Sequence, residues 1–399
     1  MSGKQWRILF VALAATVFLV KCYSAVVTLG SPDLPLWERF LTNIRENGAI
    51  SNYYSGGLYV SPRGTYINPF NHPPFIVHYL RFVGGLSDLT GLPFRFWFRL
   101  FTSLADIGSA LVLYRLLRIS GHFNPLAFLL YLLAPATIII SGYHGNTDAL
   151  MIVFLLLAIY LTQTERPAWI CGIVFGMALN IKLVPIVAAP AFFFFIPDMR
   201  RRVEFVVAAC LTFFVGSLPY IVEDPFIIYR RVFGYRSVVA RWGLTRFLAG
   251  FADVRDFDSF FNAFVRLGNY VLLGLLAAFS IKMNRKVPKP PLYVQVGIIM
   301  FIFMSFTLGY GHNYLPWLDP FAALAVSTAV LYYAASGALL VLMYFINDDE
   351  RTRWMDVSWL AVLVCTLLIF RVMRDGKEPI ASLITALRSK GTDAKADQN

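Results

Sequence analysis

Long apolar runs separated by short polar segments dominate the chain. Twelve of these runs are long and apolar enough to be interpreted as membrane-spanning segments. They lie near residues 8–29, 95–117, 123–140, 147–162, 168–181, 184–197, 203–221, 261–282, 292–309, 315–330, 332–347 and 356–373. Several are short, and 332–347 could fuse with its predecessor. The pattern therefore predicts an all-α, polytopic membrane protein with about 12 transmembrane helices.

Basic residues predict the orientation of these helices. With the N-terminus in the cytoplasm, they gather at every clear inner turn, as the positive-inside rule requires. They are Lys4, Arg7, Arg115, Arg118, Arg166, Arg200, Arg201, Arg202, Lys282, Arg285, Lys286, Lys289, Arg371, Arg374 and Lys377. The pattern holds only if residues 74–85, about a dozen in number, lie in the outer interface instead of crossing. Both termini are then cytoplasmic, in a bacterial inner membrane or an ER membrane.

Composition agrees with this class. The 399 residues are 58% hydrophobic and only 15% charged, which excludes an ordinary soluble domain. The net charge of +12 is explained largely by topology, so no nucleic-acid partner is expected. The cysteines lie inside apolar runs and show neither a disulfide framework nor zinc-ligand spacing.

One membrane domain, residues 1–374, is predicted to fill most of the chain. Its polar parts are a long first outer loop, 30–94, and a second long outer loop, 223–260. Residues 375–399 are short of apolar positions and are expected to form a polar cytoplasmic tail.

Asp33 follows the first apolar run directly, between Pro32 and Pro35. The two prolines stiffen the backbone here, and a stiff carboxylate at a membrane surface suits general-base catalysis on a hydroxyl. Asp33 could instead cap the helix that starts near Leu36. Further active-site candidates in the same loop are Glu38, Arg63, His72 and His78.

Two further polar segments are expected at the outer face. His144 and Asp148 lie in the first, where Asp148 is either a second catalytic carboxylate or a favourable acid in the first turn of a helix. His312 and Tyr314 lie in the second, and an interfacial aromatic belt is the alternative interpretation.

Lys182 interrupts an apolar stretch, 168–196, that is too long for one upright helix although both its ends are expected inside. Two short helices that meet at Lys182 to Pro185 would resolve the conflict. An ionisable residue at membrane depth lines a cavity or pairs with a charge. A lysine that snorkels to the interface is the alternative.

Five arginines lie within seventeen residues of the second outer loop: Arg230, Arg231, Arg236, Arg241 and Arg246. Guanidinium groups bind phosphate through paired, charge-assisted hydrogen bonds. Contact with anionic lipid headgroups remains the alternative.

These groups suit sugar transfer from a phosphate-linked lipid. A phosphate leaving group needs no general acid, so one carboxylate base and several cations are sufficient. Direct attack by the acceptor hydroxyl inverts the anomeric centre. Neither a metal nor another cofactor is required, since Arg and Lys can neutralise a monophosphate.

In this order, the motifs resemble those of the GT-C superfamily of integral-membrane glycosyltransferases, which use polyprenyl-phosphate sugars. The resemblance covers roughly residues 8 to 330 and includes bacterial family-87-like and dolichyl-phosphate-sugar transferase-like members, with the closest subfamily left open. Besides Asp33, it rests on Asn71-His72-Pro73-Pro74, His144-Gly145-Asn146-Thr147-Asp148-Ala149-Leu150, Asn180-Ile181-Lys182-Leu183-Val184-Pro185, Trp242-Gly243-Leu244 and His312-x-Tyr314-x-Pro316.

The resemblance implies a role for each group. Asp33 looks like the catalytic base and Asp148 like a second acidic residue of the site. Lys182 and the loop arginines look like donor-phosphate contacts, and His312 and Tyr314 like donor-site residues.

The implied reaction moves a hexose, mannose first and glucose second, from a polyprenyl-phosphate donor. The acceptor is a glycan, glycolipid or other hydroxyl on the periplasmic or lumenal side. A transporter or flippase for a lipid-linked or anionic substrate is the alternative, although no internal repeat relates two halves of the chain.

Overall fold

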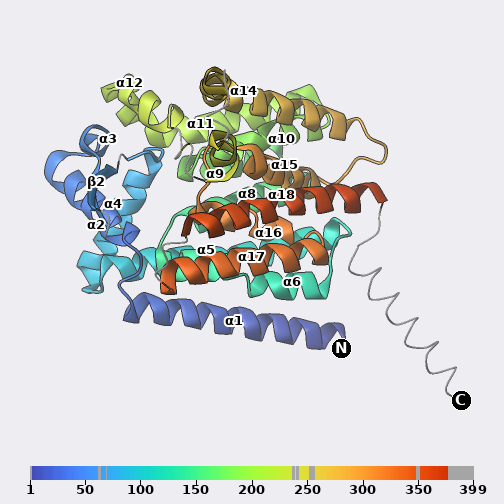
Figure 1. The fold of residues 1–399 in the computed structure, drawn as a ribbon, viewed down its shortest axis with the longest axis horizontal. Helices are drawn as coiled ribbons and strands as arrows, with labels where there is room; N and C mark the ends of the chain where they lie inside the picture. The colour runs from blue at the N-terminus through green and yellow to red at the C-terminus, as the bar shows by residue number, and fades with distance from the viewer. Residues whose placement is uncertain are drawn as a thin grey trace, which may run out of the picture.

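Helices make up almost the whole structure, a computed structural model that describes residues 2–61, 64–68, 70–235, 239, 242–250, 257–346 and 351–375. Most of them run side by side in one bundle (Figure 1). The predicted all-α membrane fold is confirmed. Within the described residues, seven helical segments are long and apolar enough to span a membrane, and four shorter apolar helices accompany them. The predicted number of spans is not confirmed.

The long segments are α1 (Gly3–Val27), α5 (Phe94–Ile119), α6 to η1 (Pro125–His144), α11 (Met199–Glu223), α14 (Phe257–Asn284), α17 (Val326–Phe345) and α18 (Arg351–Asp375). The shorter ones are α8 (Asp148–Gln163), α9 (Ala168–Ile181), η2 (Val184–Ala188) with α10 (Ala189–Phe195), and α15 (Leu292–Phe306). Within the Pro125–His144 segment, α6 spans Pro125–Leu132, α7 spans Pro135–Ile139 and η1, a π-helical turn, spans Ile140–His144.

The predicted boundary between segments 315–330 and 332–347 is wrong. Residues 312–322 form only short turns, η4 (His312–Trp317) and α16 (Asp319–Ala322), and a single helix, α17, then runs unbroken from Val326. Proline explains the difference, because Pro316 and Pro320 have no N–H for a continuous helix.

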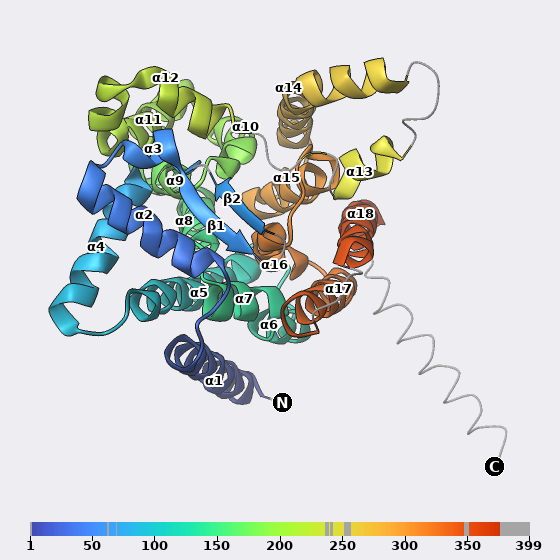
Figure 2. The same cartoon turned by 60° about the vertical axis from the view of Figure 1, so that its left-hand side comes forward.

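The first loop forms a small structured layer across one end of the bundle (Figures 1 and 2). It contains α2 (Asp33–Asn47), α3 (Ser51–Ser55), an antiparallel hairpin of β1 (Gly57–Ser61) and β2 (Gly64–Asn68), and α4 (Phe75–Thr90). Neither the candidate spans nor the shorter apolar helices among the described residues include α4, and its place in the outer interface stays a prediction. We call this end of the bundle the loop end.

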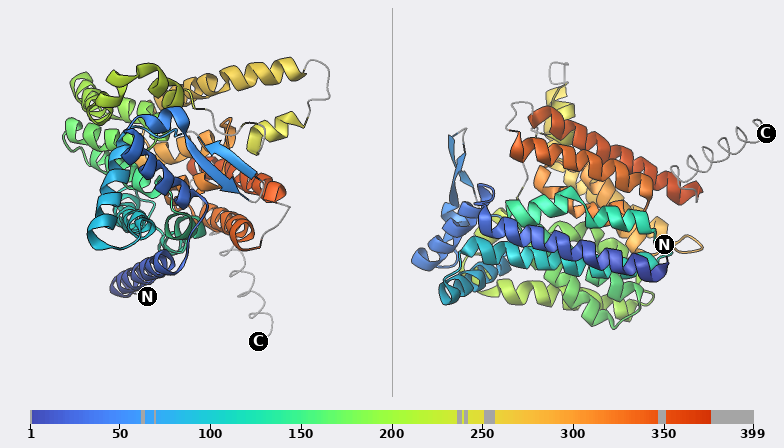
Figure 3. Two further views of the ribbon diagram at one scale, coloured as in Figure 1. Left: turned by 90° about the vertical axis from the view of Figure 1, so that its left-hand side faces the viewer. Right: turned by 90° about the horizontal axis from the view of Figure 1, so that it is seen from below.

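The opposite end carries the start of α1 and the end of α18 (Figures 1 and 3). The C-terminus of α5 and the N-terminus of α11, with the basic residues near them, lie there too. This arrangement fits the predicted charge distribution. Almost all of the predicted polar tail, from residue 376 on, lies outside the described residues.

The second loop packs on the first at the loop end. It contains α12 (Pro225–Ile228), η3 (Tyr229–Phe233) and α13 (Gly243–Ala249). The Tyr54 hydroxyl donates to Asp224 at 2.5 Å, and Arg231 Nε donates to the Tyr53 carbonyl at 2.8 Å. The start of the second loop is therefore joined to α3 of the first, whereas α13 packs on α18.

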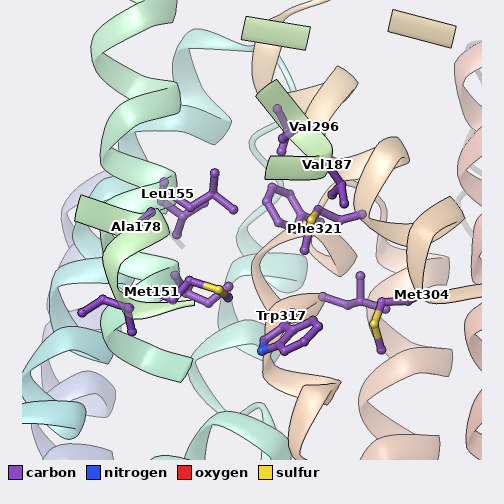
Figure 4. Packing of buried hydrophobic residues seen from close by; sticks show 14 of the residues in the cluster. Met151, Leu155, Ala178, Val187, Val296, Met304, Trp317 and Phe321 are labelled. Carbon is purple, nitrogen blue, oxygen red and sulfur yellow. The ribbon is translucent and has the colours of Figure 1, made fainter. Parts of the chain in front are cut away.

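Buried apolar side chains fill the centre of the bundle. Met151 and Leu155 of α8 pack near Val187 of η2, Phe321 of α16 and Trp317 of η4 (Figure 4). All five side chains are buried. Packing of this density keeps the broken segments at η2 and η4 in defined positions.

A fully buried arginine joins α1, α5 and the turn η1. Arg99 of α5 donates to the carbonyls of Ala25 and Thr28 at 2.8 and 2.7 Å, and to the Tyr143 carbonyl at 3.4 Å. The last carbonyls of a helix lack partners within the helix, so Arg99 supplies the donors for the end of α1.

We expect Arg99→Met to destabilise the protein. The change leaves the carbonyls of Ala25 and Thr28 without their guanidinium donor, and a buried unsatisfied polar group costs about 1–3 kcal/mol. The measurement is thermal unfolding of the purified protein in detergent. Arg118→Met is the control, because the Arg118 side chain is exposed near the other end of the same helix. Equal melting temperatures for the two variants would contradict this role of Arg99.

Candidate active site

A cavity of about 460 Å³ lies beneath the two loops at the loop end. Elements from distant parts of the sequence contribute to its walls: α2, the segment before α4, the break after α9, η3, α14 and η4. Its polar lining consists of Asp33, Asn71, His72, Asn146, Lys182, Tyr235, Asn269, Asn313 and Tyr314. The structure thus brings Asp33, His72, Lys182 and Tyr314, all predicted from the sequence, to one cavity.

Asp33 is the first residue of α2, but its side chain makes no capping hydrogen bond. The Ser31 hydroxyl accepts from the Asp33 backbone N–H at 3.1 Å instead. The carboxylate oxygen Oδ2 lies 2.8 Å from Nε2 of His144. Burial acts to raise the pKa of Asp33, but His144, His312 and Lys182 together hold this pKa below its ordinary value. The carboxyl group is therefore ionised at neutral pH.

His144 belongs to a chain of hydrogen-bonding side chains that starts at Asp33. Its other ring nitrogen, Nδ1, lies 2.6 Å from the Tyr344 hydroxyl, and that hydroxyl lies 2.9 Å from Nε2 of His312. Asp33, His144, Tyr344 and His312 come from α2, η1, α17 and η4. We call these four residues the Asp33 chain.

The turn η1 orients His144 within this chain. A π-helical turn holds one more residue than an α-helical turn and is frequent at functional sites. Ser31 donates to the His144 carbonyl at 2.9 Å, and Gly145 ends the turn with φ 78°, where a side chain would also meet Leu34. The backbone on both sides of the imidazole is therefore fixed.

Lys182 and Asp148 form an ion pair inside the protein. The ammonium donates to Oδ1 of Asp148, which also accepts from the indole N–H of Trp317 at 2.7 Å. The ammonium lies 5.8 and 5.4 Å from the ring centroids of Tyr314 and Trp317. The pairing, rather than snorkelling to a membrane surface, agrees with the expectation for an ionisable residue at this depth.

The break predicted at this lysine is confirmed. Helix α9 ends at Ile181, Lys182 itself is extended, and the short 3₁₀ turn η2 follows with Pro185 near its start. The broken backbone directs Lys182 into the cavity, where the bundle can tolerate non-helical structure.

Three other candidates of the first loop, His72, Glu38 and His78, do not belong to the Asp33 chain. His72 lines the cavity, and burial together with nearby Lys182 lowers its pKa to about 3, so it is neutral at ordinary pH. Glu38 is not among the described lining residues, and burial raises its pKa despite nearby Arg95. His78 is exposed on α4, 3.3 Å from the Gly216 carbonyl and outside the described lining.

None of the described loop arginines lines the cavity. Arg231 bonds to carbonyls of α3, Arg246 pairs with Asp356 of α18 at 2.7 Å, and Arg230 is exposed. Arg63, Arg236 and Arg241 lie outside the described residues. Phosphate binding by this group of arginines stays a prediction.

Sequence reasoning missed Tyr344 and Trp317. Tyr344 stands at the end of an apolar helix, where a tyrosine is ordinary in any membrane protein. Trp317 directly follows the His312-x-Tyr314-x-Pro316 motif, so its position gave a usable signal. Among the described residues, no group of three or more His, Cys, Asp or Glu side chains is placed to hold a metal ion.

A helical bundle with a structured first loop over a carboxylate-containing cavity is the architecture that the resemblance to the GT-C superfamily predicts. Structural comparison bears this out: the chain is similar to ArnT from Cupriavidus metallidurans, solved bound to undecaprenyl phosphate. The match has a TM-score of 0.53 at 17% identity and covers 93% of this chain and 73% of that one.

A sequence comparison points the same way. The family model described as dolichyl-phosphate-mannose-protein mannosyltransferase matches residues 71–222. No curated protein matches the chain. The resemblance to the GT-C superfamily is confirmed.

The buried pair of Lys182 and Asp148 leads to a stability prediction. We expect Lys182→Met to lower the free energy of unfolding by about 3–5 kcal/mol, because it leaves the Asp148 carboxylate buried without its cation. Adding Asp148→Asn should restore much of that loss. The measurement is thermal unfolding in detergent, and a double variant no more stable than Lys182→Met would show that the pairing is unimportant.

Proposed function

We propose that the protein is a membrane glycosyltransferase that moves a hexose from a polyprenyl-phosphate donor to a hydroxyl acceptor. The observation that carries this proposal is the presence of an ionised carboxylate, Asp33, and a cation, Lys182, in the walls of one cavity. A base and a phosphate-binding cation are the two groups that such a transfer needs.

Asp33 serves as the base in this reaction. Its carboxylate takes the proton of the acceptor hydroxyl while the hydroxyl oxygen forms a bond to the anomeric carbon. The bond from that carbon to the phosphate oxygen breaks, and its electron pair leaves with the polyprenyl phosphate. Attack opposite the leaving group inverts the anomeric centre.

Lys182 holds the donor phosphate. An ammonium group has three N–H donors, and Asp148 takes one of them. The others can meet phosphate oxygens in the cavity. Asp148 then serves to position Lys182, because its own side chain is 1% exposed and already bonded to the lysine and to Trp317.

Asparagine side chains in the cavity wall are suited to bind the sugar of the donor. Asn71, Asn269 and Asn313 line the cavity, and the buried side-chain oxygen of Asn269 has no hydrogen-bond partner among the described residues. A carboxamide both donates and accepts, as sugar hydroxyls do. Mannose is the sugar we propose first, in keeping with the description of the matched family, and glucose second.

The lipid part of the donor has a suitable groove nearby. An apolar hollow of about 570 Å³ is lined mainly by α14 and α15, including Leu272 and Ile302. The same two helices send Leu273 and Phe303 into the cavity. We propose that the polyprenyl chain lies in this groove while its phosphate reaches Lys182.

The loop end is proposed to face the periplasm or the ER lumen, with both termini in the cytoplasm. The basic residues near the start of α11 and the end of α5 support this orientation. A glycan or glycolipid on that side is the proposed acceptor. A transporter of a lipid-linked substrate would instead require two compartments and would leave the sugar–phosphate bond intact.

We expect Asp33→Asn to reduce turnover by at least 10²- to 10⁴-fold, the usual contribution of a general base. Asparagine has almost the size of aspartate and caps a helix about equally well, so fold and donor binding should persist. The assay follows release of polyprenyl phosphate from synthetic polyprenyl-phosphate mannose and glucose by purified protein in detergent.

Asp88→Asn is the matched control, because this exposed carboxylate of α4 pairs only with Arg45 among the described residues. Asp148→Asn is the comparison within the site. An active Asp33→Asn protein beside an inactive but folded Asp148→Asn protein would transfer the role of base to Asp148.

A further inference from the structure

We propose that Tyr344 is a positioning residue, which with His312 holds His144 in the tautomer and orientation that keep Asp33 ready as a base. The inference rests on the function proposed above. It also gives His312 a role through Tyr344 instead of the donor contact that the sequence suggested.

The proposal takes the imidazole of His144 as neutral, and the direction of each hydrogen bond in the Asp33 chain then follows from the charge of Asp33. A carboxylate only accepts hydrogen bonds, so Nε2 of His144 must carry the proton that faces it. In a neutral imidazole Nδ1 is then an acceptor, and the Tyr344 hydroxyl must donate to it across 2.6 Å. The tyrosine oxygen in turn accepts from Nε2–H of His312 across 2.9 Å.

All the donors in this chain therefore point toward Asp33. The arrangement stabilises the ionised carboxylate. It also leaves Nδ1 of His144, the ring nitrogen that faces Tyr344, without a proton of its own. The partner of one ring nitrogen determines the tautomer at the other. Because the Tyr344 hydroxyl bonds to Nδ1, it determines the tautomer of His144.

Geometry separates His312 from the donor site. Its neighbours Asn313 and Tyr314 line the cavity, whereas His312 is not among the described lining residues. Its ring packs edge-on against His144, with centroids 5.9 Å apart, and Nε2 is engaged by Tyr344. A direct bond from this nitrogen to a donor phosphate would break the bond to Tyr344.

Helix α17 thus contributes to the chemistry from 200 residues away in the sequence. Tyr344 lies in the last turn of α17 and also packs against Tyr143 of η1, with ring centroids 5.7 Å apart. The end of α17 and the turn η1 therefore orient the imidazole jointly.

The kinetic test is a double-mutant cycle with Tyr344→Phe and His312→Ala, using release of polyprenyl phosphate as the assay. Each single variant should lower kcat by about two- to twelvefold, the range for one neutral hydrogen bond, with donor KM little changed. Because both residues act through one chain, the double variant should be no slower than the slower single variant. Tyr79→Phe, which alters a half-buried tyrosine on α4 outside the described cavity lining, should match the wild type.

The proposal would be overturned if the kcat reduction in the double variant equalled the product of the two single reductions. A raised donor KM for His312→Ala or an unchanged kcat for Tyr344→Phe would also overturn it. Wild-type protein that releases no polyprenyl phosphate would count against the proposed function instead.

A second readout is independent of turnover. The chain has five histidines, so ¹⁵N NMR of histidine-labelled protein can assign His144 by comparison with His144→Gln. The proposal predicts a neutral ring protonated at Nε2 in the wild type and a changed Nδ1 signal in Tyr344→Phe. A ring protonated at Nδ1, or a His144 signal unaffected by Tyr344→Phe, would overturn it.

Discussion

The hydrogen bond between His144 and Asp33 joins two segments that are 111 residues apart, and much of the loop end serves to maintain it. The turn that carries His144 is held at three of its five residues. Ser141 bonds to Asp106 and Lys21, Arg99 binds the Tyr143 carbonyl, and Ser31 binds the next carbonyl. Such buried polar contacts are stabilising only when each group is satisfied, so they specify one arrangement of α1, α5 and η1. The position of Asp33 is a consequence of that arrangement.

The second constraint is the cost of a cation within a membrane bundle. Lys182 requires a partner at that depth, and Asp148 provides one from the first turn of α8. The pair leaves the ammonium beside aromatic rings in a cavity rather than in lipid. A site that must bind an anion can hold its cation in this way before the ligand arrives.

Features that depend on local pattern could be predicted from the sequence. Apolar length indicated α1, α5 and α11, and the conflict between length and charge around Lys182 indicated the break after α9. The stiff segment around Asp33 marked the base candidate. Features that depend on long-range contacts could not be predicted. The sequence does not show that Tyr344 reaches His144, or that Arg246 pairs with Asp356, because these partners lie far apart along the chain. The turns between His312 and Ala322 were apolar enough to be interpreted as part of a helix, although Pro316 and Pro320 lack the N–H groups that a continuous helix needs.

A structure of the protein with bound polyprenyl phosphate would show whether the cavity beside Asp33 receives a phosphate-linked lipid. We expect phosphate density within hydrogen-bonding distance of Lys182 Nζ, in the cavity that Asp33 lines, with the prenyl chain running along α14. Phosphate bound at the opposite end of the bundle, or a lipid that leaves this cavity empty, would show that the cavity is not the donor site.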